Sequence, residues 1–331
     1  MHKKVALTGI KPTGIPHIGN YIGAIKPALK LAETCDARYF IADYHALNAI
    51  KDAKALKELT YEIAAAWLAC GLNPDQVLFY KQSQIPETYE LMTLLLAFTP
   101  KGLMNRAHAY KAMVQKNREE GADLDDGVNM GLYTYPVLMA ADILLFDTDY
   151  VPVGNDQFQH IEMAVDIAES FNFIYQCQGF TLPTALATEH TRTVIGMDGR
   201  KMSKSYNNTI PLFAPEKELK KLIMKIVTNS QTLEEPKDPE TCNVFSLYRH
   251  FASEEQIEAL KQRYLAGGMG WGHAKTELFE VMNTVLVPLR SKYNELMLNK
   301  DYIDEVLNKG SVKARELATQ KISQLRSIVG L

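Results

Sequence analysis

The chain of 331 residues is 47% hydrophobic and 23% charged, and it carries a formal net charge of -3. This composition excludes a disordered or collagen-like chain, and the small net charge excludes binding to nucleic acid through an overall basic field, although local patches can still contact RNA. No apolar run of 18 residues predicts a membrane span, the N-terminus does not predict a signal peptide, and the four cysteines form no Cys-x-x-Cys pair. We therefore expect a cytoplasmic protein with free thiols, no membrane association and no zinc or iron–sulfur site.

The first half of the chain alternates short apolar runs with amphipathic stretches. Buried strands are predicted at residues 5–7, 39–42, 77–80 and 150–153. Apolar residues three or four positions apart, from Ile18 to Leu29, predict a helix that Pro27 kinks after its second turn. Strands that alternate with helices predict an α/β fold with a doubly wound, parallel, Rossmann-type sheet.

A strongly charged segment follows in the middle of this half. Residues 101–118 carry five basic side chains, and residues 119–126 carry five acidic ones. With Gly121 and Gly127 nearby, the segment predicts an exposed mobile loop. Such a loop is either a solvated surface feature or a gate over a substrate site.

The strand pattern stops after about residue 205. We expect a catalytic domain over residues 1–205 and a smaller all-helical domain over residues 206–331, whose C-terminal part packs back on the first domain. Pro215 opens one helical run, and the stretch from Ser253 to Gln256 resembles a capping box before another. Interruptions are predicted at residues 266–273 and at Lys309-Gly310.

A glycine-rich junction follows the first predicted strand, in the stretch TGIKPTGIPHIGNYIGAI (residues 8–25). Gly9 and Gly14 permit a sharp turn, and Gly19 permits close approach of a ligand. The helix that begins near Gly19 presents free N–H groups, which predicts an anion site at the sheet edge where ligands bind. The spacing matches neither the Rossmann fingerprint nor a P-loop, so by itself it is a weak signal.

A second segment, Gly199-Arg-Lys-Met-Ser-Lys-Ser205, places two lysines around a serine on a glycine-bounded turn. It resembles the KMSKS signature of class I aminoacyl-tRNA synthetases, and His17-Ile-Gly-Asn20 resembles their HIGH signature. The alternative for the first is a chance lysine pair, but two signatures in the right order are far more specific than one. Over nearly its full length the chain is similar to the tryptophan and tyrosine branch of this family, and most of all to its bacterial tryptophan enzymes.

The choice between the two amino acids depends on Met139. In this family the tyrosine enzymes typically carry glutamine there, and the tryptophan enzymes carry methionine, whose thioether suits packing against a flat bicycle. Asp142 accepts a hydrogen bond from an indole or from a phenol, so it does not discriminate alone. The resemblance implies L-tryptophan as substrate, with a site made of Asp142, Met139, Tyr135, Gln157, His45, Leu7 and Gly9. Core or local structural roles remain the alternatives for Asp142, Met139, Tyr135, Gln157 and His45.

The resemblance also implies an ATP site with Mg²⁺. It comprises Lys11, Pro12, Thr13, His17, Gly19, Asn20, Gly154, Asn155, Asp156, Val194, Ile195, Lys201, Met202, Ser203, Lys204 and Ser205. The catalytic groups among them are Lys201 and Lys204 on the β- and γ-phosphates, with His17 and Asn20 as hydrogen-bonding partners. Two departures from the tryptophan branch stand out: Lys11 replaces its usual glutamine, which puts that contact in doubt, and His17 replaces its frequent threonine. Lys111 and Lys116 are further candidates for contact with ATP.

The implied reaction forms tryptophanyl-adenylate and then transfers tryptophan to tRNA(Trp). The attacking carboxylate is already an anion, so the chemistry needs positioning and charge stabilisation rather than a general base. The resemblance implies a homodimer and anticodon reading by the helical domain, with candidate phosphate contacts at Lys309, Lys313, Arg315, Lys321 and Arg326. The competing hypotheses are a tyrosyl enzyme, which Met139 opposes, a small-molecule nucleotidylyltransferase, and a catalytically silent RNA-binding paralogue.

Overall fold

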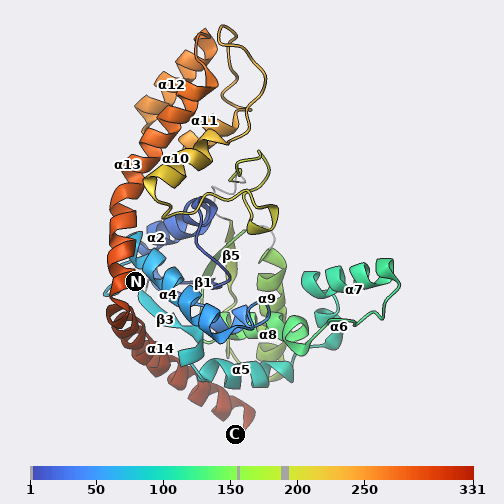
Figure 1. The fold of residues 1–331 in the computed structure, drawn as a ribbon. Helices are drawn as coiled ribbons and strands as arrows, with labels where there is room; N and C mark the ends of the chain where they lie inside the picture. The colour runs from blue at the N-terminus through green and yellow to red at the C-terminus, as the bar shows by residue number, and fades with distance from the viewer. Residues whose placement is uncertain (1–2, 155–156, 188–193) are drawn as a thin grey trace.

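A five-stranded parallel sheet forms the centre of the molecule. The computed structural model describes residues 3–154, 157–187 and 194–331. The sheet has the order β3-β2-β1-β4-β5 (Figure 1). Its strands are β1 (Val5–Ile10), β2 (Asp36–Ile41), β3 (Leu78–Lys81), β4 (Tyr150–Val153) and β5 (Thr184–Ala187). The predicted Rossmann-type fold is confirmed, but β5 was not predicted, and β1 runs on through Gly9 into the segment predicted as a turn.

Both faces of the sheet are covered, and alternate residues of each strand enter opposite cores. Tyr39 and Phe79 pack on one face, whereas Phe40 and Tyr80 pack on the other. The helices of the first half are α1 (Ile18–Asn20), α2 (Lys26–Ala32), α3 (Asp43–Ala46), α4 (Ala53–Ala69), α5 (Glu87–Leu96), α6 (Lys101–Met104), α7 (His108–Glu120), α8 (Met130–Leu144) and α9 (Phe158–Ile174). A 3₁₀ turn, η2 (Gln82–Gln84), follows β3 directly.

The first helix is interrupted at a different place, and in a different way, from the predicted kink. A π-helical segment, η1 (Tyr21–Ile25), separates α1 from α2, and the Lys26 N–H donates to the Tyr21 carbonyl across its wider turn. Pro27 is the second residue of α2, which continues η1 directly, and it has no backbone N–H to donate to the preceding turn. The chain therefore accommodates the proline by widening one turn before it.

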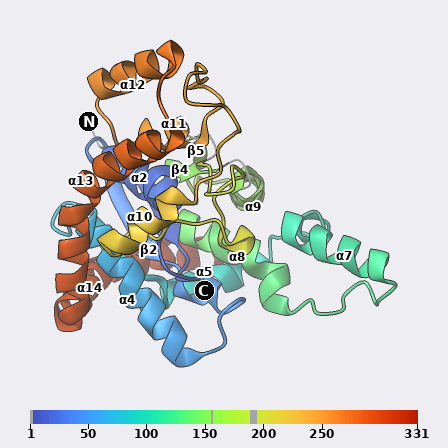
Figure 2. The same cartoon turned by 45° about the horizontal axis from the view of Figure 1, so that its top comes forward.

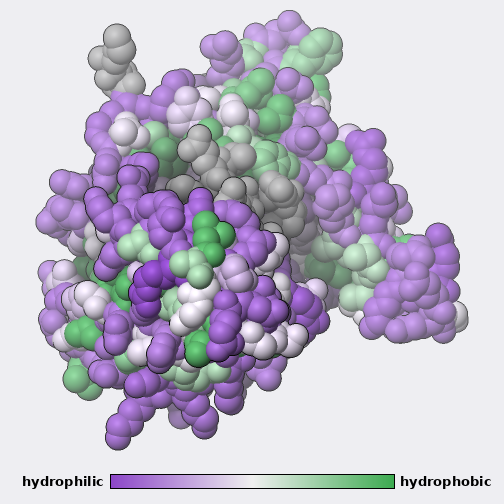
Figure 3. Space-filling view, turned by 90° about the horizontal axis from the view of Figure 1, so that it is seen from above, coloured by the Kyte–Doolittle hydropathy of each residue, from purple (hydrophilic) through white to green (hydrophobic). Residues whose placement is uncertain are grey.

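The charged segment is mostly helical over residues 101–120, so the prediction of a loop is wrong there, whereas residues 121–126 lie in turns after the last helix and are not helical. It forms α6 and α7, which project from the sheet as an arm whose tip is covered with hydrophilic side chains (Figures 1 and 3). Long basic and acidic side chains favour helix, and pairs four residues apart add support, as between Lys116 and Glu120 at 3.9 Å. Gly121 ends α7 in the left-handed conformation, with φ of 69°.

The residues described after β5 form helices and loops. The elements are η4 (Lys204–Tyr206), α10 (Glu216–Met224), α11 (Asn243–Tyr248), α12 (Glu254–Ala266), α13 (Trp271–Leu298) and α14 (Lys300–Val329). The predicted capping box at Ser253 is confirmed, and α10 begins directly after Pro215. The predicted break after α12 is present, but helix resumes at Trp271. None of the described helices combines the length and the apolar character needed to cross a membrane.

The last helix, α14, runs unbroken through Lys309 and Gly310, so the predicted interruption there is wrong. It crosses the edge of the sheet at β3, since Ile303 and Leu307 enter the core on one face and Ala318 and Ile322 enter the core on the other. In Figures 1 and 2 the helix lies along the sheet domain and ends beside α5.

Four of the five basic residues proposed for phosphate contact in the helical part bind carboxylates of the first half instead. The pairs are Lys309 with Asp75 at 2.8 Å, Arg315 with Glu87 at 2.9 Å, Lys321 with Asp147 at 2.5 Å and Arg326 with Glu90 at 2.6 Å. Lys321 is also buried, and it donates to the Gly179 carbonyl at 2.7 Å. The prediction that Lys321 contacts RNA is therefore wrong, because its ammonium group faces the protein interior.

Candidate active site

A cavity of about 260 Å³ opens at the carboxyl ends of β1 and β4. This is the point where the strand order reverses direction, which is where ligands bind in open parallel sheets. All seven residues of the predicted tryptophan site line it, together with Lys11 and Gly154 of the predicted ATP site: Leu7, Gly9, His45, Tyr135, Met139, Asp142 and Gln157. The fold therefore gathers residues from across the first half of the chain around one cavity.

Helix α8 presents three of these side chains to the cavity. Tyr135, Met139 and Asp142 follow one another at intervals of four and three residues, which places them on one helical face. Pro136 lies within this helix, in its second turn. The α8 face therefore forms one wall of the cavity.

Asp142 is buried, with 4% of its surface exposed, and two side chains hold it. His45 Nε2 lies 2.9 Å from Oδ2, and Gln82 Nε2 lies 2.9 Å from both carboxylate oxygens. Burial raises the pKa of the Asp142 carboxyl, while the bonds from His45 and Gln82 oppose that shift. Asp142 is therefore a desolvated acceptor in the cavity wall, and His45 and Gln82 hold the orientation of its carboxylate. Gln82 was not identified from the sequence, because nothing local distinguishes it from other glutamines.

Tyr135 has a partner that the sequence did not indicate. Its hydroxyl lies 2.7 Å from Nε2 of the buried His160 on α9, and Lys11 Nζ lies 5.9 Å from the centre of its ring. The His160 contact fixes the phenol at the cavity, and Lys11 brings a positive charge to the same end. Gln157, just before α9, lines the cavity as well.

The two signature segments meet beside this cavity. The Ile18 N–H donates to the Ile210 carbonyl at 2.9 Å, and the Gly19 N–H points at Met202 Sδ at 3.2 Å. Lys204 reaches the turn before the helix, where a Cβ on Gly14 would lie 2.6 Å from its Nζ. Glycine, here with φ of 147°, is therefore what leaves room for the lysine.

The charges at this junction are strongly perturbed. Burial, followed by repulsion from Lys204, lowers the pKa of His17 to about 4, so its imidazole is neutral at pH 7. Partial burial of the ammonium group lowers the pKa of Lys204, although the residue as a whole is exposed. The Asn20 Oδ1 accepts the His17 backbone N–H at 3.0 Å, which directs the Asn20 amide nitrogen away from that bond. The junction thus presents a neutral imidazole, an amide and a cation together.

The KMSKS loop is organised by Asn208, which the sequence did not single out. Its side-chain oxygen accepts the Ser203 N–H at 2.8 Å, and its Nδ2 donates to the Lys201 carbonyl at 3.0 Å and to Asp198 Oδ1 at 2.6 Å. Bonds from Asn208 and Arg200 lower the pKa of Asp198 to about 2. One buried amide therefore connects both ends of the loop.

The other predicted ATP residues are distributed around this loop and the first turn. Val194 accepts the Met202 N–H at 2.7 Å, and Ile195 forms an antiparallel bridge with Lys201. Ser203 Oγ and Ser205 Oγ lie 2.8 Å apart. Pro12 is buried in the first turn, and Thr13 is exposed there. Asn155 and Asp156 lie outside the described residues.

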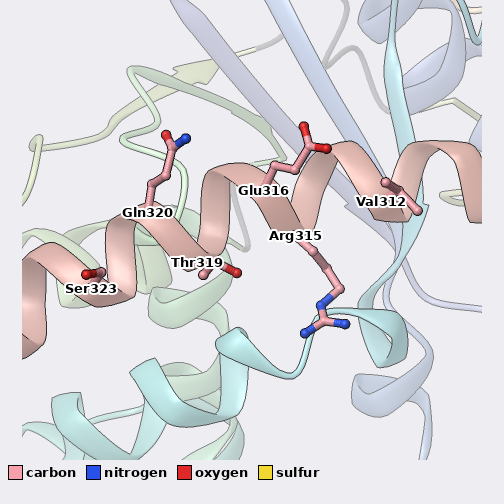
Figure 4. Close-up of a pocket in the computed structure, with 6 residues that line it drawn as sticks. All are labelled: Val312, Arg315, Glu316, Thr319, Gln320 and Ser323. Atoms are coloured by element: carbon pink, nitrogen blue, oxygen red, sulfur yellow. The ribbon is translucent and has the colours of Figure 1, made fainter.

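Lys111 and Lys116 are exposed on α7 and are not among the residues that line the cavity. A larger open hollow, of about 740 Å³, lies along α14, and its lining residues all belong to one face of that helix (Figure 4). Arg315 in this hollow points toward α5, where it binds Glu87. Within the parts of the chain that the structure describes, no group of three or more His, Cys, Asp or Glu side chains is arranged to hold a metal ion.

Comparison with known proteins gives a consistent result. The family described as tRNA synthetases class I (W and Y) matches residues 2–287. The chain is 52% identical over 328 residues to the tryptophan–tRNA ligase of Xanthomonas campestris pv. campestris, covering 98% of this chain and 76% of that protein. It is 51% identical over 329 residues to the tryptophan–tRNA ligase of Pseudomonas aeruginosa, covering 98% and 73%.

Solved structures agree with the sequence comparison. The crystal structure of Campylobacter jejuni tryptophanyl-tRNA synthetase complexed with ADP and tryptophan matches with a TM-score of 0.89 and 45% identity, covering 99% of this chain and all of that one. Tyrosyl-tRNA synthetase from Aeropyrum pernix matches with a TM-score of 0.67 but only 18% identity, which shows a shared fold.

Proposed function

Because the chain belongs to the class I tRNA synthetases for tryptophan and tyrosine, we propose a defined place in that reaction for each part of its site. The chain is a tryptophan–tRNA ligase. It activates L-tryptophan with ATP to tryptophanyl-adenylate and pyrophosphate, and then transfers tryptophan to the 3′ end of tRNA(Trp). The residue roles are those that the resemblance implies, and the cavity that brings many of these residues together supports them.

The observation that carries the tryptophan assignment is the buried Asp142 carboxylate beside Met139 in the same cavity. Asp142 accepts the indole N–H, and the Met139 thioether packs against the ring. Tyr135 and Gln157 hold the substrate ammonium group, while His45, Leu7 and Gly9 complete the pocket. Indole nitrogen is a donor only, so it suits a carboxylate that can only accept.

Activation takes place between this cavity and the signature junction. The tryptophan carboxylate attacks the α-phosphorus of ATP, and Lys201 and Lys204 stabilise charge on the β- and γ-phosphates. His17, neutral at pH 7, and Asn20 donate hydrogen bonds to phosphate oxygens. The remaining ATP contacts come from Lys11, Pro12, Thr13, Gly19, Gly154, Asn155, Asp156, Val194, Ile195, Met202, Ser203 and Ser205.

ATP would bring Mg²⁺ as its counter-ion, and the ion would supply charge neutralisation on the leaving pyrophosphate. The protein would contribute positive charge to the phosphates through Lys201 and Lys204. This division agrees with a described site that is rich in lysine and amide donors.

We propose separate roles for the two parts of the chain. A catalytic domain over residues 1–205 carries the chemistry, and the helical part over residues 206–331 reads the anticodon of tRNA(Trp). Of the basic residues considered for this contact, Lys313 is exposed on α14 and best suited to meet phosphate. We further infer a homodimer located in the cytoplasm, as its class of activity requires access to tRNA.

The specificity is tested by ATP–pyrophosphate exchange with a panel of amino acids. We expect exchange that depends on tryptophan and not on tyrosine, because Met139 offers the tyrosine phenol no polar partner, while its thioether packs well against the larger indole ring. Equal exchange with tyrosine would remove the specificity assignment. Loss of exchange with every amino acid would support the silent paralogue instead.

A further inference from the structure

Gln82 lies directly behind Asp142, outside the cavity, and is 1% exposed. Its Oε1 accepts the Tyr44 N–H at 3.1 Å and the His45 N–H at 3.4 Å, at the start of α3. Because an amide oxygen only accepts, these two N–H groups determine which end of the amide faces them. The amide nitrogen must therefore face Asp142, where it lies 2.9 Å from each carboxylate oxygen.

The two oxygens of Asp142 are not equivalent. Oδ2 receives both His45 and Gln82, whereas Gln82 is the only donor to Oδ1 among the described residues. A carboxylate oxygen has room for two donors, so Oδ1 keeps acceptor capacity toward the cavity. The same two side chains also offset the burial that disfavours the charged form of Asp142.

We propose that Gln82 is a positioning residue for tryptophan recognition, which holds the Asp142 carboxylate as an oriented acceptor with Oδ1 directed to the indole N–H. The inference rests on the proposed role of Asp142. Gln82 acts through that carboxylate and does not touch the substrate. Two other titratable groups, His45 and Asp43 from α3, influence the pKa of Asp142. Asp142 in turn helps to raise the pKa of Tyr80 from β3 and of Tyr89 from α5.

The test is Gln82→Met, which nearly keeps the size of the side chain and removes both its donor to Asp142 and its acceptor for the Tyr44 and His45 N–H groups. In tryptophan-dependent ATP–pyrophosphate exchange at neutral pH we expect the KM for tryptophan to rise by about 10-fold or more, with kcat changed by less than about 3-fold. An ionised Asp142 carboxylate accepts the indole N–H more strongly than the neutral acid does, so KM rises as pH falls. Without the Gln82 donor the carboxyl takes up a proton at higher pH, and this rise in KM must begin at higher pH than in the wild type.

The matched control is Gln84→Met, on the same 3₁₀ turn. Gln84 bonds to Asn308 and Ser311 of α14 and not to Asp142, so its variant keeps the wild-type pH profile. If Gln82→Met fails to fold, Gln82→Asn keeps the amide but withdraws it by one methylene, and the same shift is expected at smaller size. An unchanged KM and pH profile in the folded Gln82 variant overturns the inference.

Asp142→Asn separates this inference from the assignment on which it rests. We expect it to raise the KM for tryptophan and to abolish the acid-dependent rise, and in its background Gln82→Met adds little. If Asp142→Asn leaves KM unchanged, the proposed role of Asp142 fails. If Asp142→Asn raises KM while Gln82→Met alone does nothing, only the inference about Gln82 fails.

Discussion

At the scale of single residues, the proposed site holds a cation close to a neutral donor. Lys204 lies against Gly14, and the same ammonium group helps to keep His17 uncharged by lowering its pKa. A neutral imidazole can donate from one nitrogen without adding to the repulsion between nearby cations. In the proposed role, the partly buried Lys204 would interact with phosphate more strongly than a fully solvated lysine, because water screens it less.

We expect Lys204→Ala to slow adenylate formation by about 100-fold or more, because the lost charge acts on the leaving phosphates in the transition state. Tryptophan affinity should change by less than about 3-fold, since Lys204 is not among the residues that line the tryptophan cavity. Single-turnover adenylate formation and equilibrium tryptophan binding measure the two effects separately. Lys221→Ala on α10 is a matched lysine control outside the site. If this variant formed the adenylate as slowly as Lys204→Ala does, the effect would not be specific to Lys204.

At the scale of elements, the position of α14 depends on one glycine. The helix passes from one face of the sheet to the other at Gly310, where a Cβ would lie 1.8 Å from the Phe79 carbonyl oxygen. The absence of a side chain is what allows the helix backbone to rest on the edge strand. An edge strand covered in this way is also protected from pairing with another chain.

Gly310→Ala should lower the free energy of unfolding by about 1–3 kcal/mol, because the helix must move away from β3 to admit the methyl group. Gly272→Ala provides the control, since this glycine also lies in a long helix but has open space around its Cβ position. That variant should be unchanged or more stable by up to about 1 kcal/mol. Urea unfolding of both proteins checks the prediction, and equal midpoints would contradict the packing argument.

At the scale of the whole molecule, the helical part and the sheet domain share interior surface. Ile18, Ile22 and Met202 pack into the same core as residues of α10, α11 and α13. Helix α1, which carries part of the HIGH-type signature, therefore packs against the helical part of the chain. Helix α14 packs against β3, at the edge of the sheet. Exposed pairs such as Arg326 with Glu90 contribute little to stability, whereas loss of the buried Lys321 would deprive Asp147 and the Gly179 carbonyl of this donor.

Lys321→Ala should destabilise the protein by about 1–3 kcal/mol, because Asp147 and the Gly179 carbonyl lose a shared donor. Lys313→Ala, at an exposed position on the same helix, should lower the free energy of unfolding by less than about 0.5 kcal/mol. Thermal unfolding of the two variants tests the difference. Reduced tRNA charging by Lys313→Ala without loss of stability would further separate an RNA contact from a structural one.

The sequence by itself determined the features that local patterns encode. Apolar runs marked four of the five strands, and the two signature motifs identified the family and led to the residues around the cavity. The resemblance named Tyr135, Met139 and Asp142 as site residues, and the structure then showed that they share one face of α8. Such information is local, because it lies in periodicity and in turn chemistry within a few residues.

Only the tertiary structure decided which distant groups meet. Gln82 behind Asp142, His160 on Tyr135 and Asn208 inside the KMSKS loop are ordinary polar residues until the fold gives them partners. Lys321 resembled a surface cation, and Gly310 resembled a helix break, for the same reason. Burial and hydrogen bonding between remote segments set these roles, and no window of neighbouring residues contains them.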